Sequence, residues 1–173
     1  PPSWPDRCGY CDFVTVVGRH SQHAEYVEAL LAELELERGV LSAELETVFL
    51  GGGTPTFTEP QALERLLSSL PPANEVTVEA NPSRREIPDW EGLRRAGVTR
   101  ISLGVQSLRD PELTALARGQ TAEEARAAFA AASVTFHNVS VDPLYGIPGQ
   151  SLTNWNQGVR TALASPPSHL PLR

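Results

Sequence analysis

A chain of 173 residues, with 40% hydrophobic and 20% charged residues, is long enough and apolar enough to form one globular domain with a buried core. Its net charge is −7, and its fourteen basic residues are all arginines scattered along the chain, which argues against a nucleic-acid partner. It contains no apolar run of about 18 residues and no signal-peptide pattern, so we expect no transmembrane segment and a cytoplasmic protein.

Two cysteines, Cys8 and Cys11, lie in a Pro- and Gly-containing segment at the start of the chain. In a reducing compartment such a pair is typical of metal binding or redox chemistry. On this spacing alone a buried pair, a redox pair and half of a zinc site remain open, although a four-cysteine zinc site would lack its second pair. The chain has no methionine, even at position 1, so we expect its two ends to be cuts rather than natural termini.

A predicted strand at 46–50 (ETVFL) runs directly into the glycine-rich segment 51–55 (GGGTP). Its continuous β-branched and aromatic residues are typical of a parallel strand that is buried on both faces. Successive glycines allow positive φ and let backbone N–H groups approach a ligand closely. We therefore expect a binding loop at Gly52, Gly53 and Thr54, with a plain tight turn as the alternative.

Helices and strands alternate along the rest of the chain. Periodicity, caps and breakers predict helices at 24–38, 59–70, 90–96, 110–118, 121–132 and 151–164, and strands at 75–79, 98–104 and 138–141. A further strand is expected to begin at 169–172. Thr58 and Thr121 are expected N-caps, the second with Glu124 in a capping box. The alternation predicts right-handed βαβ crossovers and a parallel sheet.

Polar residues follow the predicted strands. Ligands of parallel α/β proteins bind at the carboxyl ends of the strands, where the following loops converge. Glu79, Gln106 and Asp142 stand at such ends, although for Glu79 a solvated carboxylate is an equal alternative. Arg118 is expected at a helix end, where an interaction with the helix dipole would also explain it. The histidines show no ligand spacing and are expected at surface or loop positions: His20, His23, His137 and His169.

Five segments stand in one order along nearly the whole chain: CGYCDF (8–13), GGGTP (51–55), EANP (79–82), LGVQS (103–107) and DPLYGIPG (142–149). Together they resemble the radical S-adenosylmethionine proteins of the oxygen-independent coproporphyrinogen III oxidase family. The resemblance implies an α/β fold, an open parallel (β/α) barrel, that holds a [4Fe–4S] cluster on the three cysteines of a CxxxCxxC motif. It also implies S-adenosylmethionine at the fourth iron, whose reductive cleavage gives a 5′-deoxyadenosyl radical.

The resemblance assigns roles by position. Cys8 and Cys11 become the second and third cluster ligands, and Tyr10 becomes an aromatic contact to adenosylmethionine. Soft thiolates suit iron, and backbone groups and carboxylates suit a cationic amino acid derivative. The remaining contacts to adenosylmethionine are assigned to Gly52, Gly53, Thr54, Glu79, Gln106, Arg118 and Asp142.

The sequence also departs from the family pattern. Trp4 stands where the first cluster cysteine belongs, and an indole cannot ligate iron. The strand that normally precedes the cluster loop is absent, and the chain stops at the start of the sixth strand. We therefore expect a partial barrel, a radical SAM core fragment over 1–173, with a degenerate cluster loop at 1–13 and consecutive βα units at 46–172. Unpaired sheet edges lead us to expect self-association of the isolated chain.

Smaller differences bear on function. Phe13 stands where the oxidases of this family carry a fourth cysteine, which favours the heme-chaperone branch, with heme or a porphyrin as a further ligand of the full-length protein. Pro143 replaces an aliphatic strand residue, and Gln120 replaces a histidine that is common in close relatives. We expect a radical SAM domain fragment of porphyrin and heme metabolism with a labile or absent cluster and no adenosylmethionine cleavage. The alternative is a non-catalytic remnant or a small-ligand-binding parallel-barrel domain.

Overall fold

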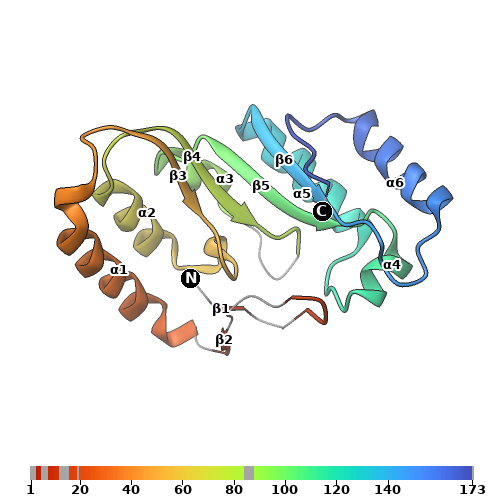
Figure 1. The fold of residues 1–173 in the computed structure, drawn as a ribbon, viewed down its shortest axis with the longest axis horizontal. Helices are drawn as coiled ribbons and strands as arrows, with labels where there is room; N and C mark the ends of the chain where they lie inside the picture. Colours follow the sequence, from red (N-terminus) through yellow and green to blue (C-terminus); the bar gives the residue numbers. More distant parts are fainter. Residues whose placement is uncertain (1–2, 5–7, 12–15, 19, 84–87, 173) are drawn as a thin grey trace.

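The computed structural model describes residues 3–4, 8–11, 16–18, 20–83 and 88–172, drawn as a coloured ribbon in Figure 1. Within these residues the main sheet has four parallel strands in the order β3-β4-β5-β6. This arrangement confirms the α/β class and the parallel sheet that the alternating pattern predicts. The strands are β3 (Leu45–Leu50), β4 (Ala73–Ala80), β5 (Arg100–Gln106) and β6 (Asn138–Pro143).

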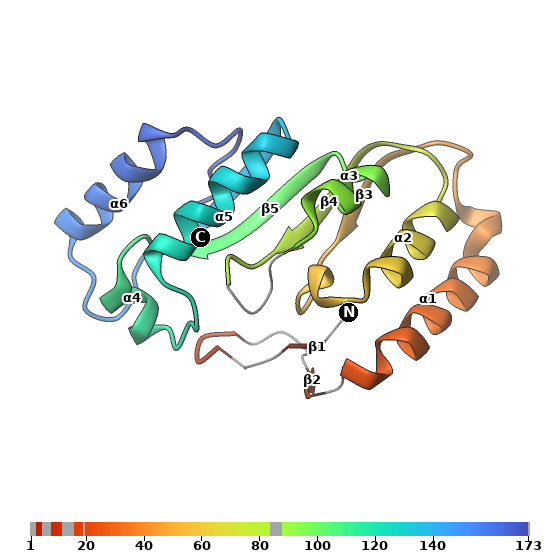
Figure 2. The ribbon, with the colours of Figure 1, turned by 180° about the vertical axis from the view of Figure 1, so that it is seen from behind.

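Helices α2, α3 and α5 lie in front of the sheet in Figure 2, and Figure 1 looks at the opposite face. Their apolar side chains form the main core with one face of the sheet, where Val78, Ile101 and Leu103 are fully buried. Burial of this apolar area is the main stabilising contribution to the fold. The helices are α1 (His23–Glu37), α2 (Pro60–Ser69), α3 (Trp90–Arg95), α4 (Asp110–Ala115), α5 (Ala122–Thr135) and α6 (Leu152–Ala164), with short 3-10 turns η1 (His20–Gln22), η2 (Arg38–Val40) and η3 (Pro55–Phe57).

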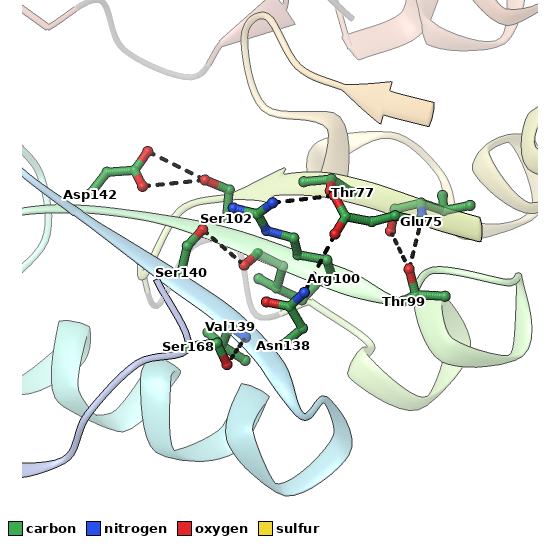
Figure 3. A network of polar contacts seen from close by, with 12 residues as sticks. Glu75, Thr77, Thr99, Arg100, Ser102, Asn138, Val139, Ser140, Asp142 and Ser168 are labelled. Carbon is green, nitrogen blue, oxygen red and sulfur yellow. Dashed lines mark hydrogen bonds and ion pairs between the residues drawn. The ribbon is translucent and has the colours of Figure 1, made fainter. Parts of the chain in front are cut away.

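The opposite face of the sheet is polar, because side chains alternate between the two faces of a strand. In Figure 3 the Glu75 carboxylate of β4 accepts hydrogen bonds from Thr77 Oγ1 at 3.0 Å and from Arg100 Nη1 of β5 at 3.2 Å. Asn138 Nδ2 of β6 lies 3.5 Å from the second Glu75 oxygen. These contacts cross three neighbouring strands and hold their register below the carboxyl ends.

Strand β3 is less buried than its sequence suggests. It lies at one end of the order of the main sheet, with β4 as its partner in the described part of the chain. Phe49 is 62% exposed, so the expectation of a strand buried on both faces is wrong. A run of apolar residues cannot distinguish an edge strand from a central one, since strand order depends on contacts far apart in the sequence.

The predicted caps give one confirmation and one correction. Thr121 accepts from the backbone N–H of Glu124 at 3.1 Å, and Glu124 accepts from the N–H of Thr121 at 2.7 Å, which confirms the capping box. Thr58 does not cap α2: the N-cap is Glu59, which makes no side-chain capping bond, and Pro60 is the first helical residue. Proline is favoured at that position because its missing N–H needs no partner there.

Two short segments complete the description. Strand β1 (Ser3–Trp4) pairs in parallel with β2 (Val16–Val17), outside the main sheet. Near the end of the chain, Val141 N–H donates to His169 O at 3.1 Å, so the residues predicted to open another strand lie beside β6. None of the described helices has the length and apolarity needed to cross a membrane.

Candidate functional site

The central feature at the carboxyl ends of the strands is the guanidinium of Arg118. Its Nη2 donates to Asn81 Oδ1 at 2.8 Å, to the Gly104 carbonyl at 2.8 Å and to Gln120 Oε1 at 2.9 Å. Asn81 Nδ2 in turn donates to Thr54 Oγ1 at 2.7 Å. We call these five residues the strand-end network: Thr54, Asn81, Gly104, Arg118 and Gln120.

The direction of Arg118 is set by the end of α4, which stops at Ala115 and not at residue 118 as expected. Ala117 adopts a left-handed φ of 53°. Arg118 N–H bonds to Leu113 O at 2.9 Å and Ala117 N–H to Thr114 O at 3.0 Å, the two bonds of a Schellman motif. The Arg118 side chain therefore extends from the end of α4 toward the sheet. An interaction with the dipole of α4 does not by itself explain its position.

The glycine loop after β3 brings backbone close to a carboxylate. Gly52 has a φ of 101°, as expected for a loop that needs glycine. A Cβ on Gly51 would lie 3.1 Å from Glu79 Oε2, so the absence of a side chain there lets the carboxylate lie against the loop. The next two residues of the loop, Gly53 and Thr54, are buried. The structure thus places the glycine loop and Glu79 side by side.

Gln106, at the end of β5, is a non-glycine residue with a φ of 65°. The β5–β6 register is irregular between Leu103 and Gln106, and Gln106 O accepts from Leu144 N–H at 2.8 Å. A Cβ on Gly104 would lie 3.1 Å from Asn81 Oδ1 and 3.3 Å from Gln106 Nε2. A left-handed conformation at a residue with a Cβ is unfavourable and often occurs at binding sites.

Asp142 is buried at the end of β6, next to Ser102 of β5. Ser102 Oγ donates to the two carboxylate oxygens at 3.4 and 3.3 Å, as Figure 3 shows. Ser102 pairs in register with Glu79 of β4. The two candidate carboxylates therefore lie on the polar face on either side of β5, Glu79 on β4 and Asp142 on β6.

The cysteine loop, residues 8–11, lies against the strand-end network. Cys11 N–H donates to Cys8 O at 3.2 Å, and Arg118 Nη1 lies 3.4 Å from Cys8 Sγ. Cys8 is 7% exposed and Cys11 is half-buried. Burial raises the pKa of the Tyr10 phenol above its ordinary value, although the neighbouring Arg118 guanidinium lowers it. The cysteine loop therefore brings its thiols and the Tyr10 phenol close to the Arg118 guanidinium from the segment after α4.

Sequence reasoning did not select Asn81, Gln120 and Ser102 as site residues. Asn81 has a local signal, since it follows β4 directly and precedes Pro82. Gln120 donates from Nε2 to Val105 O at 2.9 Å, so it holds the backbone of β5 as well as Arg118.

The expectation for His23 is also wrong. It is 4% exposed at the start of α1, and its ring packs edge-on against Phe57 with centroids 5.9 Å apart. The side chain of His20 lies outside the described residues.

Comparison with known proteins supports the family resemblance that the five ordered segments of the sequence indicate. The family model described as the radical SAM superfamily matches residues 5–158, which include both cysteines and all the strand ends described above. The chain belongs to the radical SAM superfamily. This confirms the family that the five ordered segments suggest.

Among the radical SAM relatives, the Escherichia coli (strain K12) protein named heme chaperone HemW is 36% identical over 173 residues, 95% of this chain and 46% of that protein. The Mus musculus protein named radical S-adenosyl methionine domain-containing protein 1, mitochondrial, is 34% identical over 180 residues, 98% of this chain and 41% of that protein. The structure of coproporphyrinogen III oxidase (HemN) from Escherichia coli, described as a radical SAM enzyme, has a TM-score of 0.85 and 25% identity, covering 99% of this chain and 42% of that chain. The chain spans less than half the length of these relatives.

The family implies a [4Fe–4S] cluster and S-adenosylmethionine, and the donor sets for these two groups differ in this chain. The sequence has two cysteines in all, with Trp4 at the remaining position of the CxxxCxxC pattern. In the part of the chain that the structure describes, no group of three or more His, Cys, Asp or Glu side chains is arranged to hold a metal ion. These residues do not fit a cluster held by three cysteines. The Glu79 carboxylate beside Gly51 and the Arg118 guanidinium are instead of the chemical types that suit a ligand with amine, carboxylate and hydroxyl groups.

Proposed function

We propose that this chain binds S-adenosylmethionine at the carboxyl ends of β3 to β6 and that its own cysteines do not hold a stable [4Fe–4S] cluster. The observation that carries the proposal is the strand-end network, in which a guanidinium, an amide and a hydroxyl from three loops meet beside Cys8. By position, the contacts to adenosylmethionine fall to Tyr10, Gly52, Gly53, Thr54, Glu79, Gln106, Arg118 and Asp142.

The chemistry of these groups matches the ligand. A guanidinium suits the ligand carboxylate, whereas the carboxylates of Glu79 and Asp142 suit its amine and ribose hydroxyls. Glycine N–H groups of the 51–53 loop suit the methionine part. In radical SAM proteins the cluster supplies the electron that cleaves adenosylmethionine. This chain has only the thiolates of Cys8 and Cys11 to hold a cluster, so we infer that it binds the ligand without cleaving it.

We place the role of the full-length protein in heme or porphyrin metabolism, on the heme-chaperone branch. Two observations support this: the relatives named heme chaperone HemW, and Phe13 at the position where the oxidases of this family carry a fourth cysteine. Phe13 lies outside the described residues. Heme as a ligand of the full-length protein, and a cytoplasmic location, stay predictions.

Anaerobic reconstitution with iron and sulfide tests the metal part of this proposal. The wild-type chain should retain less than about one iron per chain, whereas Trp4→Cys should retain about four and show the absorbance and EPR signals of a [4Fe–4S] cluster. Trp4→Cys combined with Cys8→Ser is the matched control and should again lose the cluster. A full cluster in the wild-type chain would contradict the proposed impairment.

The proposal makes this chain a non-catalytic domain that binds the adenosyl ligand, and the incomplete cysteine set supports this part of it. Titration of the iron-free chain with S-adenosylhomocysteine tests it, since the contacts proposed for Glu79, Arg118 and Asp142 do not involve iron. Micromolar binding supports it. No binding of S-adenosylhomocysteine by the wild-type chain would contradict it, and a Trp4→Cys variant that also holds no iron would contradict the proposed cluster position.

A further inference from the structure

A buried carboxylate lies outside the residues assigned to the ligand. Glu112, in the first turn of α4, is 6% exposed. Its Oε2 accepts from Ser107 Oγ at 2.6 Å and from Gln150 Nε2 at 3.0 Å. A buried carboxylate is unfavourable unless hydrogen bonds replace its water, so these contacts indicate what holds Glu112 in place. We call Ser107, Glu112 and Gln150 the Glu112 clamp.

One arm of the Glu112 clamp fixes the turn after β5. Ser107 directly follows Gln106, the residue with the left-handed φ of 65°. Besides donating to Glu112, the Ser107 hydroxyl accepts from Arg109 N–H at 3.1 Å. The backbone on the C-terminal side of Gln106 is therefore fixed through the Ser107 side chain.

The other arm fixes the loop between β6 and α6. Gln150 Oε1 accepts from Gly146 N–H at 2.9 Å while its Nε2 donates to Glu112. The same loop is joined to Gln106 directly, because Leu144 N–H donates to the Gln106 carbonyl. The loop that follows Asp142 and the turn that contains Gln106 are thus tied together at two places.

A small cavity adjoins the Glu112 clamp. It has a volume of about 20 Å³ and is lined by residues that include Gln106, Glu112, Gln150 and Trp155. This volume has room for one water molecule. Glu112 Oε1 and Arg109 Nε form an ion pair at 3.4 Å, and neither atom makes a hydrogen bond to a described residue.

We propose that Glu112 is a positioning residue for the adenosylmethionine site. It holds Gln106 in its left-handed conformation through Ser107, and it holds the β6–α6 loop through Gln150. The inference rests on the proposed function, because Gln106 and Asp142 are assigned there to the ligand. Glu112 itself acts through these residues and does not touch the ligand.

Hydrogen exchange on the iron-free chain tests the clamp without any ligand. Glu112→Ala should raise the exchange rates of the Leu144 and Gly146 amides by at least about tenfold, whereas Glu112→Gln should leave them near the wild-type rates. The glutamine oxygen can accept from both Ser107 and Gln150, as the carboxylate does. Wild-type protection in Glu112→Ala would overturn the proposal.

Titration with S-adenosylhomocysteine tests the positioning role. Glu112→Ala should bind about tenfold more weakly and Glu112→Gln within about threefold of wild type. Leu93→Ala is the matched control, since Leu93 is buried in α3 away from the strand ends: it should lower the melting temperature but leave the affinity unchanged. An equal loss of affinity in Leu93→Ala, or none in Glu112→Ala, would overturn the positioning role. If the wild-type chain bound no S-adenosylhomocysteine, the proposed function would fail, and the positioning role with it.

Discussion

The strand-end network and the cysteine loop lie next to each other but are held in different ways. The network is closed by side-chain hydrogen bonds of 2.7–2.9 Å that join the glycine loop, β4, β5 and the segment after α4. The cysteine loop meets it through Arg118, whose Nη1 lies 3.4 Å from Cys8 Sγ. The geometry of the first region follows from the sheet and helix ends, whereas the role proposed for the second depends on a metal group for which the sequence supplies two cysteines.

From this difference we propose that the two parts of a radical SAM site can be separated in this chain. Parallel strands bring their carboxyl ends together whether or not a cluster is present, because core burial fixes the strands. A cluster instead depends on the number and type of its ligands. Loss of one cysteine should therefore abolish the metal chemistry and leave the ligand-binding groups in place.

Arg118→Ala should have the largest effect on the network. It removes the donor shared by Asn81, Gly104 and Gln120, and hydrogen bonds from a charged group contribute about 1.5–3 kcal/mol each. We expect S-adenosylhomocysteine affinity to fall about 100-fold in calorimetric titration. Arg126→Ala, an exposed arginine on α5, is the control and should bind like wild type. Unchanged binding in Arg118→Ala would show that the network is structural only.

Asn81→Ala should have a smaller effect. Asn81 joins Thr54 to Arg118, and its loss leaves the buried Thr54 hydroxyl without this donor. We expect a loss of about 1–3 kcal/mol in the free energy of unfolding, measured in urea, and about tenfold weaker S-adenosylhomocysteine binding. Asn74→Ala, at an exposed position on β4, should change neither the free energy of unfolding nor the affinity. Equal results for the two variants would count against the bridging role.

Gly51→Ala should have a smaller effect than Asn81→Ala and should weaken S-adenosylhomocysteine binding by about three- to tenfold. The added Cβ would lie 2.5 Å from Phe49 Cε1 and 3.1 Å from Glu79 Oε2, so the carboxylate must shift while the exposed Phe49 ring can turn away. Gly39→Ala is the control, since a Cβ there meets nothing within 4 Å. Full affinity in Gly51→Ala would show that Glu79 does not need its place against the glycine loop.

Ala117→Gly should have the smallest effect, and it should be stabilising. Two helices end in Schellman motifs, α4 with Ala117 at a φ of 53° and α3 with Gly97 at a φ of 96°. Ala117→Gly should raise the free energy of unfolding by about 0.5–1 kcal/mol, and Gly97→Ala should lower it by about 1 kcal/mol. Urea unfolding measures both. A loss of S-adenosylhomocysteine affinity in Ala117→Gly would show that the strained alanine itself is needed to direct Arg118.

Local sequence patterns predicted the features of the fold that depend on residues close together in the chain. The Thr121–Glu124 capping box and the strand ends at Glu79, Gln106 and Asp142 follow from side chains a few positions apart. Pro60 could also have shown that α2 begins one residue after Glu59 and that Thr58 is not its cap.

Contacts between distant residues could not be predicted in this way. Asn81 and Arg118 are 37 residues apart, and no local signal marks Ala117 as the left-handed residue that directs the arginine. The exposure of Phe49 depends on strand order, which the apolar run of β3 does not encode. The family resemblance predicted which residues contact the ligand, whereas the hydrogen bonds of Arg118 could be seen only in the fold.

Calorimetric titration of the reduced, iron-free chain with S-adenosylhomocysteine tests the central claim most directly. Wild type and Cys11→Ser should both bind with micromolar dissociation constants that agree within about threefold, because the strand-end network does not depend on a cluster. No binding in the wild-type chain, or binding of ribose 5-phosphate in its place, would contradict the claim that the ligand-binding part of a radical SAM site is intact without its metal part.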